Sequence, residues 1–128
     1  MATTNNYEVH HETDANGITY RLLIEQDLTP VRGNALASGD DMADKAAEDE
    51  IIKRLDSGDT WAWAGVECEA SFEGFISSEY LGNCSYENTQ SFIAPGGYWD
   101  DMKYEAAKSL KAQLLNASLA WRKLSGAE

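Results

Sequence analysis

The sequence predicts an α+β fold in which a four-stranded, mostly antiparallel sheet carries two helices on one face. Three observations lead to this prediction. First, apolar residues alternate with polar ones in four segments, which turn residues separate into two pairs. Second, each pair is followed by a segment whose apolar residues have the period of a helix. Third, a length of 128 residues suits one domain. The element order ββαββα therefore gives a two-layer sandwich within a single domain over residues 1–128.

The first two strands are expected at residues 7–13 and 18–27. Between them, Asn16 and Gly17 supply the positive φ angles that a tight hairpin turn requires. Apolar side chains alternate along the second strand, which directs one row of them toward a core. This row consists of Ile18, Tyr20, Leu22 and Ile24.

A helix is expected from about Asp40 to Asp56. Ser38 and Asp41 have the spacing of a capping box, and acids in a first turn suit the helix dipole. Its apolar residues recur at intervals of three and four, which predicts one face turned toward the sheet. This stripe consists of Ala43, Ala46, Ala47, Ile51 and Leu55.

The second half of the chain predicts the same succession of elements. Strands are expected at residues 61–72 and 75–82, a long loop at 83–97 and a helix at about 98–123. At roughly 1.5 Å per residue the last helix spans about 40 Å, so its C-terminal turns should project beyond a small sheet. We expect the two strand pairs and the two helices to share one core, including Leu22, Ile24, Ile51, Leu55, Val66, Cys68, Met102 and Leu110.

An eight-residue pattern, Asp-Asp-Met-x-x-x-Ala-Ala, occurs at residues 40–47 and again at 100–107. Each copy opens an expected helix after two expected strands, so the chain can be interpreted as a ββα unit repeated over residues 1–58 and 61–124. Coincidence is the alternative, because acids in a first turn and alanines in a helix are favoured by local physics alone. Both interpretations lead to the same fold.

The net charge of −12 exceeds the roughly 2 to 8 units that keep a small domain soluble. Nucleic acid and anionic membranes are therefore poor partners. The N-terminus lacks the basic and apolar regions of a signal peptide, so a cytoplasmic location is expected. The sequence holds no complete catalytic, cofactor-binding or metal-ligand constellation, and we expect a protein that is not an enzyme and uses no cofactor or metal.

Weaker chemical signals do not change this expectation. His10 and His11 are adjacent on a strand, so their side chains point to opposite faces and do not form a metal-binding pair. Cys84 has no neighbouring Cys-x-x-Cys partner or histidine, and both cysteines are expected to be thiols. Glu67 and Glu69 share a strand face, for which two exposed carboxylates are the default interpretation.

The acidity is concentrated in residues 1–97, which hold 18 acids and 5 bases. On the first helix several acids recur at intervals of four residues, roughly 5 to 6 Å apart. This row consists of Asp40, Asp44 and Glu48, and it is flanked by Asp41, Asp49 and Asp56. One interpretation is a row that occupies a cationic groove built for nucleic acid. The other is a solvated face with internal pairs such as Asp49 with Lys53.

Trp61 and Trp63 lie two residues apart on an expected strand and so would share one face. They either pack under the 83–97 loop or against Trp99, or form an aromatic patch for a partner, since Trp is enriched at interfaces.

Four runs of residues resemble those of small uncharacterised accessory proteins of tailed bacteriophages and prophages. The resemblance covers about residues 18–115. The runs are GNALASGD at 33–40, WAW at 61–63, YLGNCSY at 80–86 and PGGYWDDM at 95–102. The resemblance implies an accessory protein made in the bacterial cytoplasm during infection, and it supplies no catalytic residues. Small acidic phage proteins of this kind often bind and block host factors, including restriction and CRISPR effectors.

These observations give two functional hypotheses. In the first, the protein inhibits a host nucleic-acid-binding or defence protein by presenting acids to its cationic surface, as a DNA mimic does. In the alternative, it has a structural, assembly or scaffold-like role in the phage, with the aromatic patch as the contact surface. The oligomeric state is left open, and a dimer is compatible with both hypotheses.

Overall fold

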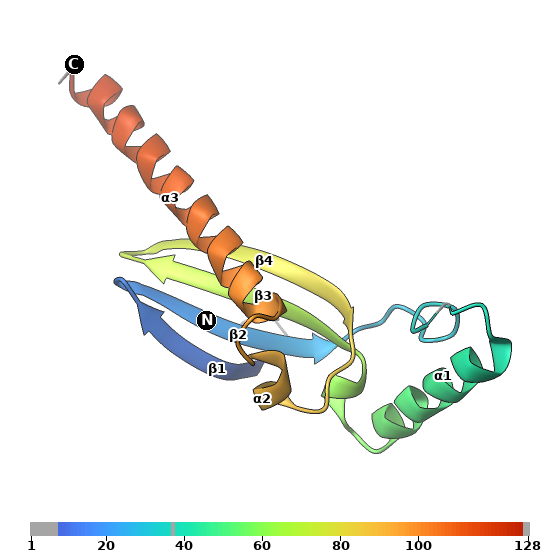
Figure 1. The fold of residues 1–128 in the computed structure, drawn as a ribbon. Helices are drawn as coiled ribbons and strands as arrows, with labels where there is room; N and C mark the ends of the chain where they lie inside the picture. Colours follow the sequence, from blue (N-terminus) through green and yellow to red (C-terminus); the bar gives the residue numbers. More distant parts are fainter. Residues whose placement is uncertain (1–7, 37, 127–128) are drawn as a thin grey trace.

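The structure is a computed structural model that describes residues 8–36 and 38–126 (Figure 1). It confirms the α+β class and the order ββαββα, with two short helices added. Residue 7, where the first strand was expected to begin, lies outside the described residues. The elements are β1 (Glu8–Ala15), β2 (Ile18–Gln26), α1 (Asp41–Asp56), the 3-10 helix η1 (Thr60–Ala62), β3 (Ala64–Phe72), β4 (Phe75–Cys84), α2 (Thr89–Phe92) and α3 (Tyr98–Ser125).

The four strands form one antiparallel sheet in the order β1-β2-β3-β4. The β1–β2 turn has positive φ angles at Asn16 and Gly17, as expected, and the β3–β4 turn has them at Glu73 and Gly74. In the central pair, Leu22 lies opposite Cys68, so the apolar rows of β2 and β3 fall on the same face.

The core lies between this face and the first half of α3, which crosses the sheet diagonally (Figure 1). The side chains of Trp99 and Leu110 are almost fully buried there. They pack with the apolar rows of the two central strands, which include Leu22, Ile24, Val66 and Cys68. Leu114 still packs against the core, and Gln113 donates a hydrogen bond to the carbonyl of Ile76. The later turns of α3 project into solvent, as the length of the helix predicted.

Helix α1 does not cover the sheet, and the expectation that it would was wrong. It stands beyond one end of the strands, where η1 is its main contact (Figure 1). Ile51 and Leu55 are only partly buried and lie outside the core cluster. The stripe of α1 is mostly alanine, so it offers little apolar surface for burial against a sheet.

Two local expectations also need correction. Asp40, rather than Ser38, is the N-cap of α1, and its side chain accepts hydrogen bonds from the N–H groups of Met42 and Ala43. Residues 60–62 form η1 instead of the start of a strand, because Asp59 accepts a hydrogen bond from the N–H of Trp61 and caps this turn.

Candidate functional site

The carboxylates of the row expected on α1 form hydrogen bonds within the protein. Asp40 caps the helix, and Asp44 accepts hydrogen bonds from the backbone N–H and the hydroxyl of Ser38, the latter at 2.7 Å. Both acids therefore hold the segment before α1 against its first turns, and they are not an unoccupied row for a partner.

Glu48 and Asp49 fix the same segment further along the helix. Glu48 is buried, and it accepts hydrogen bonds from the N–H of Gly33 at 2.8 Å and from Arg32 at 3.1 Å. Asp49 binds Arg32 at 2.6 Å and Lys45 at 2.9 Å, and these hydrogen bonds lower the pKa of its carboxyl group. The pairing of Asp49 with Lys53 was wrong. Asp41 remains exposed in the first turn of α1.

Trp61 and Trp63 are core residues, and the hypothesis of an aromatic patch at these positions was wrong. Trp61 is 6% exposed, stacks near Phe92 with ring centroids 5.2 Å apart, and donates its indole N–H to Thr89. Trp63 is 2% exposed and donates its indole N–H to the carbonyl of Thr29 at 2.8 Å. Both indole rings connect loops to the end of the sheet through packing and hydrogen bonds. Trp61 packs against the 83–97 loop, which was one of the two alternatives expected for it.

The side of the sheet opposite α3, called the open face below, is an acidic surface built from strand residues. Strand residues alternate between the two faces, so neighbours of the buried row point outward here. Its acids come from three strands, and they are Glu12 and Asp14 of β1, Glu25 of β2, and Glu67 and Glu69 of β3.

Among the strand residues that the structure describes, Arg21 is the only arginine or lysine on this face. It lies between Glu12 and Glu69, at 3.2 Å and 3.4 Å, and its side chain is 46% exposed. Glu67 is 7% exposed and accepts a hydrogen bond from Ser78 at 2.7 Å. The open face therefore has an ordered centre surrounded by acids that are more accessible to solvent.

Apolar side chains frame this acidic centre. Val9 and Ile76 are each 54% exposed and Tyr80 is 67% exposed, all on the two edge strands. Exposed aromatic side chains such as that of Tyr80 are enriched where proteins contact one another. The alternation in the sequence placed Glu67 and Glu69 together, but it did not show that no helix would cover them.

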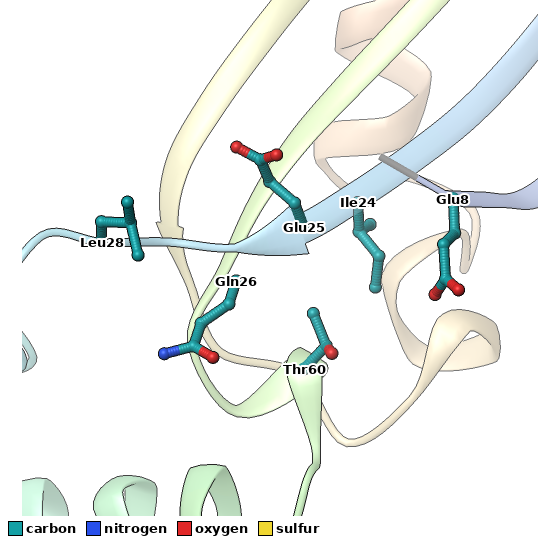
Figure 2. Close-up of a pocket in the computed structure, with 6 residues that line it drawn as sticks. All are labelled: Glu8, Ile24, Glu25, Gln26, Leu28 and Thr60. Atoms are coloured by element: carbon teal, nitrogen blue, oxygen red, sulfur yellow. The ribbon is translucent and has the colours of Figure 1, made fainter. Parts of the chain in front are cut away.

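One hollow of the surface lies at the end of β2. Figure 2 shows this hollow, about 240 Å³ in volume, where the carboxylate of Glu25 points away from Gln26 and Thr60. Cys68 and Cys84 are buried thiols outside any disulfide, as expected. Burial raises the pKa of Cys68 to about 12 and that of Cys84 to about 11, so both stay protonated at neutral pH.

Within residues 8–36 and 38–126, no group of three or more His, Cys, Asp or Glu side chains has the geometry to hold a metal ion. In the same part of the chain, no helix is long and apolar enough to cross a membrane. Comparison with protein-family models, with curated proteins and with solved structures finds no match to this chain.

Proposed function

We propose that this protein acts by binding another protein, with the open face as the contact surface and a cationic region of the partner opposite it. One observation carries this proposal: α3 covers one side of the sheet, and the strands direct four accessible carboxylates to the other side, those of Glu12, Asp14, Glu25 and Glu69, beside Arg21 and the buried Glu67. Side chains on a strand lie roughly 6.7 Å from the next on the same face. The carboxylates are therefore presented at fixed spacing.

The partner that fits best is itself a nucleic-acid-binding protein, because such proteins line their grooves with Lys and Arg. A net charge of −12 favours rapid encounter with such a groove. The sequence resemblance favours a specific form of this proposal, in which a phage accessory protein inhibits a host defence protein in the bacterial cytoplasm. The mimicry expected for α1 is thereby proposed for the sheet instead, because Glu48 of α1 is buried and Asp40 and Asp44 fix the start of that helix and the segment before it.

Binding is proposed in preference to catalysis for two reasons. The polar side chains around the hollow at the end of β2 do not converge on a common point. Both thiols have raised pKa values and so are poor nucleophiles at neutral pH.

The test compares two triple variants that remove the same formal charge. The open-face variant is Glu12→Gln, Glu25→Gln and Glu69→Gln, and the matched control is Asp41→Asn, Glu50→Gln and Asp56→Asn on α1. A partner is captured from infected host cells with the unmodified protein and purified. Association and dissociation rates are then measured by surface plasmon resonance at two salt concentrations.

We expect the open-face variant to associate roughly tenfold more slowly at low salt, with a smaller change in dissociation, because steering acts on encounter. The control should retain most of the association rate. Equal slowing in both variants would mean that net charge alone matters, and normal association of the open-face variant would refute the proposed surface.

A phage assembly role is the second candidate function. The observation in its favour is the exposed apolar surface on the projecting end of α3, which includes Leu115, Trp121 and Leu124. If a partner is held by this end, truncation of these residues should raise its dissociation rate with little dependence on salt. The open-face variant would then bind normally.

A further inference from the structure

The side of α3 that faces away from the sheet forms a continuous exposed surface, called the outer ridge. Its side chains recur at intervals of three, four or seven residues, which keeps them on one side of the helix. The outer ridge consists of Asp101, Tyr104, Lys108, Leu115, Leu119 and Arg122, all exposed. Leu115 is 60% exposed and Leu119 is 47% exposed, so the ridge has apolar residues without a covering element.

We propose that the outer ridge pairs with the same ridge of a second copy of this chain, with the two α3 helices antiparallel. This inference does not depend on the proposed function of the open face, because the ridge and the open face lie on opposite sides of the sheet.

One antiparallel register brings the exposed leucines of the ridge to the middle of the contact. It places Leu119 beside Lys108 of the second copy. The same register brings Leu115 of one helix beside Ala112 of the other, next to the two-fold axis. Both halves of the contact are then identical, as the symmetry of a homodimer requires.

The charges of α3 are complementary only in the antiparallel direction. Its first part carries Asp100, Asp101 and Glu105 with Lys103, and its later part carries only bases, Lys108, Lys111, Arg122 and Lys123. The register set by Leu119 places Lys123 beside Glu105 of the second copy, twice in the dimer. A parallel pair would instead place acid beside acid and base beside base, which is unfavourable.

The oligomeric state of the protein in solution tests this proposal. Sedimentation equilibrium of the full chain should give twice the monomer mass of 14.1 kDa. Leu119→Glu should raise the dimer dissociation constant at least about tenfold, because it puts a charge into an apolar contact. The control is Leu124→Glu, an 83% exposed leucine that lies about 140° around the helix from Leu119. It should leave the mass unchanged, and circular dichroism should show equal helix content in both variants.

A charge exchange tests the register itself. Glu105→Lys and Lys123→Glu should each weaken the dimer severalfold, and the double variant should restore it, since the pair is then reversed in both halves. A wild-type chain that stays monomeric at about 1 mM would overturn the proposal. So would a dimer that Leu119→Glu leaves intact, or a monomer whose ridge binds vesicles of phosphatidylcholine and phosphatidylserine.

Discussion

Helices α1 and α3 begin with the same pattern, Asp-Asp-Met-x-x-x-Ala-Ala, yet they have different places in the fold. Met42 of the first copy is 83% exposed, whereas Met102 of the second is 7% exposed in the core. Asp40 is the N-cap of α1, but Asp100 lies inside α3 and accepts a hydrogen bond from the N–H of Gly96. The pattern favours a helix start in both places, and it does not determine where the helix packs.

The difference comes from the surrounding residues. In α3, Trp99 and Leu110 flank the pattern and bury large apolar side chains against the sheet. Within α1, which is described throughout, Glu48 is the one buried side chain. The two helices are therefore held by different forces, α3 by apolar burial and α1 largely by hydrogen bonds and ion pairs.

The largest expected effect comes from truncating the two matched methionines. Met102→Ala should lower the free energy of unfolding by about 2 to 4 kcal/mol, because it leaves a cavity in the core. Met42→Ala should change it by less than about 0.5 kcal/mol. Urea unfolding followed by circular dichroism measures both. Similar losses in the two variants would show that the repeated pattern does have equivalent surroundings.

A smaller effect is expected for the polar attachment of α1. Glu48→Ala leaves the N–H of Gly33 without its carboxylate partner, and it removes one partner of Arg32. We expect a loss of about 1 to 3 kcal/mol in the same unfolding measurement. Asp41→Ala, at an exposed position of the same helix, is the control and should cost less than about 1 kcal/mol. If Glu48→Ala left the free energy of unfolding unchanged, the polar contacts of Glu48 would not be what holds α1 in place.

The smallest effect concerns Asp27, which fastens the chain between β2 and α1. Burial raises the pKa of its carboxyl group, but hydrogen bonds from the N–H groups of Asn83 and Thr29 outweigh burial, and the pKa is lowered overall. A lowered folded-state pKa stabilises the fold above the unfolded-state pKa of about 3.9, and this contribution is lost as pH falls through the folded-state pKa.

Asp27→Asn should therefore cost about 1 kcal/mol at pH 7, because an amide cannot accept both hydrogen bonds. The variant should also lose less stability than the wild type between about pH 5 and pH 3. Chemical unfolding at several pH values measures both effects. If the two proteins lost stability in parallel, Asp27 would have no part in the pH dependence.

The sequence was sufficient where local chemistry decides the structure. Asn16-Gly17 predicted a hairpin, the alternation in β2 predicted its buried row, and the length of α3 predicted its projection. The position of α1 was not predictable, because a stripe containing Ala43 and Ile51 has the right period but says nothing of the surface available to cover it.

The candidate site was less predictable than the fold. The spacing of Asp44 and Glu48 predicted a carboxylate row, but it could not show that the segment before α1 folds back and occupies both side chains. Trp63 was expected on a strand with Trp61, but it lies between η1 and β3, and its indole N–H binds the carbonyl of Thr29, 34 residues away. Contacts of this range depend on the tertiary structure, which the alternation of residues does not encode.

Hydrogen exchange tests the central claim, that α1 is attached separately from the core formed by α3 and the sheet. Amide exchange of the wild-type protein is followed by NMR at neutral pH, and residues 45–56 are compared with residues 102–110. We expect the α1 amides to exchange through a local opening well before global unfolding, whereas the α3 amides exchange only with it. Equal protection of the two segments would contradict this account and would mean that α1 belongs to the same cooperative unit.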